Sequence, residues 1–222
     1  MDPTPPELAL PELVLPELVL PELTDGAADQ LVSRADLVGL RFADVDATGL
    51  DLTGARFEEC ELSAVRLDDT RLTAVRLIDC RLENLDVAVL LAARPTWRGV
   101  QLRGSRIGSA ELYDGEWSSV SVTDCRLGYL NFRHAKLTEV RFSGCRITEL
   151  DLSGASLTQV VLTECEIETL TLTGARLKDV DLRGAQLREI TGLAALSGAT
   201  IDETQLVQLA PLLAAEAGIA VR

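Results

Sequence analysis

Apolar residues recur along most of this chain at a spacing of five. Stepping by five from Leu37, nearly every position as far as Leu187 is apolar. An amphipathic helix repeats its apolar side chains about every 3.6 residues and a half-buried strand every second residue. A sustained period of five fits neither element, so the pattern predicts a repeat architecture.

A second set of apolar positions lies two residues before each of these centres. It holds small or branched side chains, as at Ala135, Val140, Cys145 and Leu150. The other three positions of each pentad carry almost all of the charge, and glycine recurs in the last of them. We expect that last position to require a positive φ in a tight turn.

The residue types of this second set repeat after twenty residues. The series that begins at Ala135 is followed by a matching series, which is Ala155, Val160, Cys165 and Leu170. If four pentads make one square coil, residues twenty apart stack on neighbouring coils, about 4.8 Å apart. The pattern therefore predicts an all-β fold, a four-sided parallel β-solenoid of about eight coils over residues 35–192.

Individual pentads resemble those of a known family. The segments "ADLVG", "ARFEE", "AKLTE", "ASLTQ", "ARLKD" and "AQLRE" are similar to pentapeptide repeats, and the resemblance covers residues 35 to about 190. It implies a right-handed quadrilateral β-helix. The ending "LSGATIDETQLVQLAPLLAAEAGIAV" also resembles the C-terminal segments of bacterial members, which in several relatives form a helix that joins two chains head to head.

One stretch of the repeat looks strained. The segment "AVLLAARPTWRG", residues 88–99, places Pro95 at an inward position, while Leu82 and Leu102 stay in phase. We expect a distorted coil there without a net insertion. Trp97 and Trp117 fall in one column a coil apart, and Gly115 would make room for the indole ring. Stacked core aromatics are favoured over an aromatic pair that binds a ligand.

An acidic N-terminal segment, residues 1–34, precedes the solenoid. Its stretch "PELALPELVLPELVLPEL", residues 6–23, also repeats in fives, but with proline and glutamate in every repeat. It could wind one more coil, with these leucines inward: Leu8, Leu10, Leu13, Leu15, Leu18 and Leu20. It could instead stay extended and polyproline-like, against the solenoid end. We favour the extended form.

Residues 193–222 follow the solenoid and predict a short helix. Thr200 or Asp202 can cap a helix from about residue 203 to 217, with Gly218 as the stop. Pro211 would interrupt or kink it. The helix could merely seal the last coil. The resemblance favours sealing combined with formation of a homodimer, whose interface would hold Leu206, Leu209, Leu212, Leu213 and Ile219.

The sequence offers few candidate residues for catalysis or for binding a metal or cofactor. The chain has one histidine, His134, in an outward position, and five cysteines. Cys60 and Cys80 share one inward column, and Cys125, Cys145 and Cys165 share another, as expected of free thiols that serve as small apolar side chains. No nucleophile, base and orienting group converge by spacing, and no glycine-rich phosphate loop precedes a helix. We predict no enzyme, no metal site and no cofactor.

Composition sets the class of protein and its location. The 222 residues are 47% hydrophobic, which is enough for one domain with short appendages, and the net charge is −14. Such a charge disfavours direct binding to nucleic acid or to an anionic membrane. The N-terminus lacks the positive region of a signal peptide, and no apolar run approaches about 18 residues. We expect a cytoplasmic protein.

The outward charges leave two functions open. Residues 35–189 hold 25 acidic and 19 basic residues. The most acidic face carries Asp46, Asp68, Asp69, Asp86, Glu149, Glu166, Glu168 and Glu189. The family resemblance implies an interaction protein that mimics duplex DNA, binds DNA gyrase or another type II topoisomerase, and protects it from quinolones or topoisomerase toxins. Duplex DNA would carry about three charges per coil, several-fold more than this shell. The alternative is a structural or adaptor solenoid for a non-topoisomerase partner.

Overall fold

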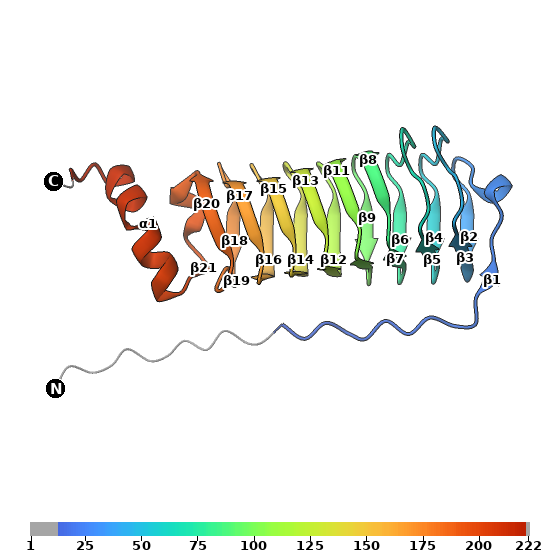
Figure 1. Ribbon diagram of the computed structural model, residues 1–222, viewed down its shortest axis with the longest axis horizontal. Helices are drawn as coiled ribbons and strands as arrows, with labels where there is room; N and C mark the ends of the chain where they lie inside the picture. The colour runs from blue at the N-terminus through green and yellow to red at the C-terminus, as the bar shows by residue number, and fades with distance from the viewer. Residues whose placement is uncertain (1–12, 221–222) are drawn as a thin grey trace.

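The computed structural model describes residues 13–220 and confirms a parallel β-solenoid, of about nine turns, followed by one C-terminal helix (Figure 1). Strands on neighbouring turns pair in parallel. The register is twenty residues through the centre of the rod, where Leu77 pairs with Trp97 and Trp97 with Trp117. This is the stacking that the twenty-residue pattern predicts.

The strands form two long sheets. The larger has fifteen strands: β1 (Thr24–Asp25), β2 (Asp36–Val38), β3 (Leu40–Ala43), β4 (Arg56–Glu58), β5 (Glu61–Ser63), β6 (Arg76–Ile78), β7 (Arg81–Glu83), β9 (Thr96–Arg98), β10 (Gln101–Arg103), β12 (Glu116–Thr123), β14 (Lys136–Ser143), β16 (Ser156–Thr163), β18 (Arg176–Lys178), β19 (Val180–Asp181) and β21 (Ala199–Thr200). The smaller has six strands: β8 (Asp86–Leu91), β11 (Arg106–Glu111), β13 (Arg126–Asn131), β15 (Arg146–Asp151), β17 (Glu166–Thr171) and β20 (Gln186–Thr191).

We name the four faces of the rod A to D in chain order. Each is defined by its central inward residues, which recur every twenty positions: Leu37 to Leu177 for face A, Phe42 to Leu182 for face B, Ala47 to Leu187 for face C, and Leu52 to Leu172 for face D. Faces A and B belong to the larger sheet, while face C and the start of face D belong to the smaller one.

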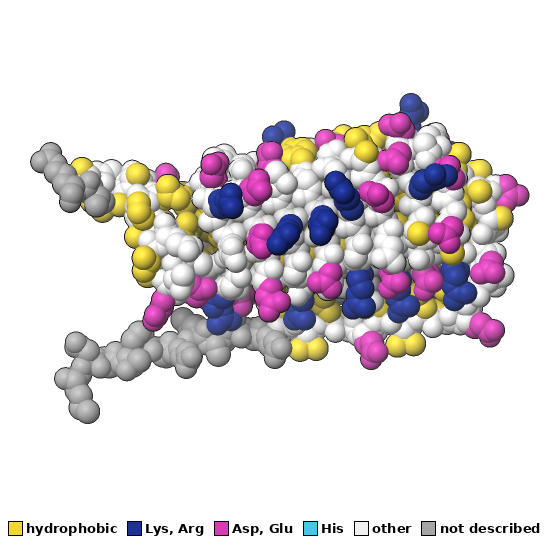
Figure 2. Space-filling view, viewed as in Figure 1, with side chains coloured by type: hydrophobic (Ala, Val, Ile, Leu, Met, Phe, Trp, Pro, Cys, Tyr) yellow, Lys and Arg dark blue, Asp and Glu magenta, His cyan; other side chains and the backbone are white. Residues whose placement is uncertain are grey.

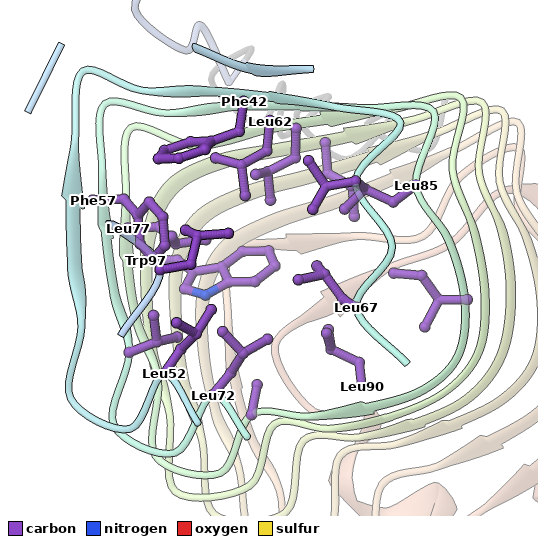
Figure 3. A pocket seen from close by; sticks show the side chains of 17 residues that line it. Phe42, Leu52, Phe57, Leu62, Leu67, Leu72, Leu77, Leu85, Leu90 and Trp97 are labelled. Atoms are coloured by element: carbon purple, nitrogen blue, oxygen red, sulfur yellow. The ribbon is translucent and has the colours of Figure 1, made fainter. Parts of the chain in front are cut away.

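The core is a single column of apolar side chains inside the coils. Figure 3 shows the leucines of the first coils pointing inward together with Phe42, Phe57 and Trp97. They surround a cavity of about 40 Å³ whose lining is wholly apolar, and a cavity of this kind stays dry. Trp97 and Trp117 stack with ring centroids 4.2 Å apart and planes 13° apart, which confirms the predicted aromatic pair.

The cysteines and the histidine lie where the repeat predicts. All five cysteines are buried and free, and the Cys80 thiol donates to the carbonyl of Phe57 at 3.4 Å. His134 is exposed, with a φ of 57°. The nine glycines in the last pentad position all have a positive φ, and so do non-glycine residues in that position, such as Ala64 and Ala74. The expectation is wrong on face C from the third coil on, where strands such as β8 run through that position and residues such as Val89 do not have a positive φ.

The expected distortion at residues 88–99 is wrong. Strand β8 keeps the twenty-residue register with β11, and β9 keeps it with β6 and β12. Pro95 fits because the equivalent N–H, as at Val75, bonds only to the carbonyl three residues earlier, at Leu72, within its own turn. Proline therefore costs no bond between coils.

Gly115 has a different role from the one expected. A Cβ atom at this position would lie 2.7 Å from Cδ of Pro95 and 2.8 Å from the carbonyl oxygen of Leu112. Gly115 therefore makes room for the proline ring one coil earlier, rather than for the indole of Trp117.

The rod extends beyond the predicted residues 35–192 at both ends. At the start, Thr24 pairs with Leu40, a short 3-10 helix spans Ala28–Gln30, and Leu31 is buried under the first coil. At the end, Val180 pairs with Ala199 after a second 3-10 helix, Leu193–Leu196. Because these registers are shorter than twenty residues, the pentad count does not detect them.

The segment before β1 is extended, as favoured. Residues 13–23 form no helix or strand and lie along the side of the rod, not on its end (Figure 1). The predictions for Leu8 and Leu10 lie outside the described residues.

The C-terminal helix α1, Glu203–Glu216, closes the rod and confirms the predicted helix. Asp202 caps it, accepting a hydrogen bond from the N–H of Gln205 at 2.8 Å. The helix continues through Pro211 without ending there.

Candidate protein-binding face

All eight acidic residues predicted to bind a partner lie on face C. Five of them are on strands of the smaller sheet: Asp86 on β8, Glu149 on β15, Glu166 and Glu168 on β17, and Glu189 on β20. The other three precede this sheet on earlier coils. Asp46 pairs with Arg66 through an isolated bridge, and the Asp68 carboxylate accepts a hydrogen bond from the N–H of Ala88 at 2.7 Å.

The acidic residues of face C form two groups, with arginines between them. On successive coils Asp86 is followed in the same column by Arg106, Arg126 and Arg146. The next residue of this column, Glu166, is acidic again. We call Arg106, Arg126 and Arg146 the arginine column. Like charges one coil apart repel, so the column and the two acidic groups make a negative, positive, negative pattern along the rod.

Ion pairs neutralise only part of this pattern. Arg66 contacts Asp46 at 2.6 Å and Arg146 contacts Glu166 at 3.0 Å. Within residues 13–220, Arg106 and Arg126 form no ion pair, so most of the arginine column faces solvent uncompensated. The hydroxyl and the N–H of Thr48 lower the pKa of the exposed Asp46 carboxyl below its ordinary value, and Arg66 adds to the effect.

A cleft of about 460 Å³ lies where helix α1 meets the end of face C. Glu166, Glu168 and Arg188 line it from the rod, and Leu209 and Leu212 line it from the helix. Such a size is within the range of ligand-binding clefts. The sequence alone did not predict this cleft, because it depends on how the helix packs against the coils.

The residues predicted for a dimer interface differ in how far they are exposed. Leu206, Leu212 and Ile219 are 52%, 40% and 62% exposed, and Leu213 is half-buried. Leu209 is only 4% exposed, because residues of its own chain cover it. It is therefore not available to a second chain. Val207, which the sequence analysis did not select, is 74% exposed.

Other kinds of site are not found in the described part of the chain. Between residues 13 and 220 no group of three or more histidine, cysteine, aspartate or glutamate side chains could hold a metal ion. No helix of that part is long and apolar enough to cross a membrane.

Two family models match the chain. A model of the pentapeptide repeat region matches residues 115–191, and a model of eight pentapeptide repeats matches residues 32–63. The chain is a pentapeptide repeat protein. One match lies in the first coils and the other extends to the end of β20, and residues 64–114 between them are not matched.

Two solved structures are similar to the chain at low identity. Full-length QnrB1, a plasmid-mediated fluoroquinolone resistance protein, is 17% identical with a TM-score of 0.36, over 85% of this chain and 94% of its own. HetL, involved in heterocyst differentiation regulation in the cyanobacterium Nostoc, is 20% identical with a TM-score of 0.35, over 78% of this chain and 92% of its own. No curated protein matches the chain.

Proposed function

We propose that this pentapeptide repeat protein is a non-enzymatic interaction protein that binds a protein partner through face C. The observation that carries the proposal is the arrangement of charge on this face, with two acidic groups, an arginine column between them, and at one end a cleft that charged side chains and leucines line together. Complementary charge sets orientation and association rate, whereas burial of an apolar anchor supplies most of the affinity. Face C offers both.

The first candidate partner is DNA gyrase or another type II topoisomerase, protected from quinolones or toxins. Each acidic group on face C presents carboxylates from successive coils, about 4.8 Å apart, along a straight rod. A positively charged DNA-binding saddle is the kind of surface that such a rod fits by charge and shape. Each acidic group would imitate only a short stretch of duplex DNA, because its carboxylates take the place of only a few phosphates.

The arginine column supports the second candidate, an adaptor for a non-topoisomerase protein. A surface built to bind duplex DNA would repel Arg106 and Arg126, and no carboxylate of the described residues pairs with either. A partner with an acidic patch between two basic patches would complement the whole of face C. Its binding would need no likeness to DNA.

A gyrase supercoiling assay tests the first candidate. We compare the wild-type chain with Glu168→Lys/Glu189→Lys, which reverses two exposed carboxylates of face C that form no ion pair within residues 13–220. The matched control is Glu59→Lys/Asp179→Lys on face A, with the same change in net charge. We expect the wild type and the control to inhibit supercoiling, or to rescue gyrase from a quinolone. The face C variant should lose at least most of that effect. No effect of the wild type at micromolar concentration would exclude this candidate.

Reversal of the arginine column separates the two candidates. Arg106→Glu/Arg126→Glu makes face C more like DNA, so its effect on gyrase should increase if the protein is a DNA mimic. If the partner instead has an acidic centre, the variant should lose a partner that the wild type retains in a pull-down.

We further propose that the protein acts in the cytoplasm. Its five buried, free thiols are of the kind found in a reducing compartment.

A further inference from the structure

The N-terminal segment lies along the rod as a strap. We define the strap as residues 13–23, which are extended and follow the side of the rod from its first coils toward its middle (Figure 1). Leu13 is 8% exposed, whereas Val14 and Val19 are 80% and 78% exposed. The strap therefore has an inner side of leucines and an outer side of valine, proline and glutamate.

A groove of about 470 Å³ lies between the strap and the rod, along the corner between faces A and B, and residues 13–18 form one of its walls. The rod side of this groove is built mainly from small or polar side chains: Asp79, Gly99, Gln101, Ser119, Ser121, Thr123, Arg141 and Ser143. In the column of Gly99 and Ser119, other coils carry Glu59 and Glu139, and in the column of Ser121 other coils carry Arg41, Arg81 and Arg141. Glycine and serine at the centre of the groove leave room that larger side chains would occupy.

Five residues of the strap span nearly the same length as three coils of the rod. Five residues of polyproline-like chain span about 15.5 Å, and three coil steps span about 14.4 Å. Leu13, Leu18 and Leu23, five residues apart, are therefore spaced at about three coils along the rod. All three are buried or half-buried, whereas Val14 and Val19 are exposed, so the leucine spacing keeps one side of the strap against the rod.

Few interactions hold the strap in place. Among the described residues, the one hydrogen bond between strap and rod joins the Arg141 guanidinium, which donates, to the carbonyl of Leu13. Apart from that carbonyl, the backbone of residues 13–23 forms no hydrogen bond with the described coils, whereas the N–H of Thr24 donates to the carbonyl of Gly39 at 3.0 Å and that of Gly26 to the carbonyl of Arg41 at 2.7 Å. The strap can thus leave the groove by movement before Thr24, without opening a coil.

We propose that the corner groove is a binding site for extended segments with the Leu-x-Leu-Pro-Glu pattern, and that its occupant in trans is the strap of a second copy of this chain. The strap fills the site in cis and competes with any second segment. The chain itself carries the segment whose spacing matches the groove, which is why we assign the trans site to a second copy. Faces C and D stay uncovered when straps exchange.

The test uses a fluorescent peptide with the sequence of residues 13–25 and the full-length chain. The variant Leu15→Asp/Leu18→Asp/Leu20→Asp opens the groove, because buried carboxylates disfavour the docked strap. These leucines lie outside the core of the rod, so the variant should keep the wild-type melting temperature. We expect the peptide to bind this variant at least about tenfold more tightly than the wild type, whose tethered strap acts at high effective concentration.

Filling the groove provides the control. Ser121→Arg, added to the opened variant, introduces the residue that the next coil carries in this column as Arg141 and should abolish peptide binding. A peptide with its leucines replaced by aspartate should not bind either variant. Failure of the peptide to bind the folded, opened variant, or equal binding after Ser121→Arg, would overturn the proposal.

A second measurement does not depend on the opened variant. In the wild-type background, Ser121→Arg should displace the strap and speed cleavage by a glutamate-specific protease after Glu17. Equal cleavage rates in the two proteins would contradict a strap seated in this groove.

Discussion

At the scale of single residues, the outward positions differ greatly in how much they matter for stability. Asp151 is an outward residue on face D, yet it is buried, and it accepts hydrogen bonds from Ser153 and from the Arg133 guanidinium at 2.6 Å. Burial alone would raise the pKa of its carboxyl, but the bonds from Ser153 and Arg133 outweigh burial and lower the pKa below its ordinary value. Asp151 is therefore stabilising in its charged form.

The variant Asp151→Asn tests this contribution. Because the folded-state pKa is depressed, the stabilisation is present above the unfolded value of about 3.9 and is lost as the pH falls through the lower folded value. We expect the variant to reduce the free energy of unfolding at pH 7 by about 1 to 3 kcal/mol. The difference in free energy of unfolding between wild type and variant should shrink as the pH falls from about 5 to about 2. Urea unfolding across this range measures it. Glu59→Gln, an exposed control, should change the free energy of unfolding little. If the loss of stability in Asp151→Asn does not depend on pH, the charged carboxylate of Asp151 does not stabilise the fold.

Single residues also show what the sequence could predict. The cysteine columns and the tryptophan stack follow from the period of twenty, because each depends only on which residues lie one coil apart, and most of the positive-φ positions follow from the period of five. The role of Gly115 was missed, since it depends on the volume of Pro95 rather than on periodicity. The burial of Leu209 was missed because both sides of the C-terminal helix are apolar, and the sequence does not say which side faces the coil.

At the scale of elements, the C-terminal helix seals the rod through one polar side chain. Gln205 is buried, and its amide nitrogen donates to the carbonyls of Leu182 and Ala185 at 2.6 and 2.7 Å. These carbonyls belong to the end of the solenoid, where no further coil pairs with them. A parallel solenoid needs such a cap, because its terminal coil otherwise leaves backbone groups unpaired.

Gln205→Leu tests the cap. Leucine keeps the apolar volume but removes one bond from each carbonyl. Leu182 keeps only the bond from the N–H of Ala185, and the carbonyl of Ala185 loses its donor, so we expect the free energy of unfolding to fall by about 1 to 3 kcal/mol. Gln208→Leu, on an exposed position of the same helix, is the control and should change stability by less than about 0.5 kcal/mol. Denaturant unfolding compares them, and equal effects would show that the carbonyls do not depend on Gln205.

We propose that the outer side of the same helix forms the homodimer interface. Leu206 and Val207 are exposed apolar side chains that contribute nothing to the cap. We expect sedimentation to give a dimer for the wild type and a monomer for Leu206→Glu/Val207→Glu, with the melting temperature of the rod unchanged because Gln205 and Leu209 remain. If the variant stays dimeric, this side of the helix is not the dimer interface.

The strap is an element whose conformation the sequence predicted only in part. Its proline content favoured an extended chain, and that is what the structure shows for residues 13–23. Its place along the A and B corner could not be predicted, because the groove arises from serine and glycine positions on coils that are distant in sequence. Residues 24–34 were assigned to the tail for a similar reason, since their register with the first coil departs from twenty.

At the scale of the whole molecule, charge and shape together define what the rod can bind. Figure 2 shows acidic and basic side chains interleaved along the visible surface, as expected of a solvated solenoid that avoids long ladders of like charge. Face C departs from this mixture through its two acidic groups and the arginine column. The sequence identified the acidic residues of this face, but its cleft became visible only once helix α1 was placed.

The account depends on residues twenty apart lying on one face of a four-sided coil, because this stacking brings the charges of face C together. A distance measurement between spin labels at Thr48→Cys and Thr148→Cys tests it most directly, since both positions are exposed on face C and the native cysteines are buried. Five coil steps predict a narrow distribution centred at about 24 Å, widened only by the label linkers. A broad distribution, or one centred beyond about 40 Å, would contradict the stacking and the binding face built on it.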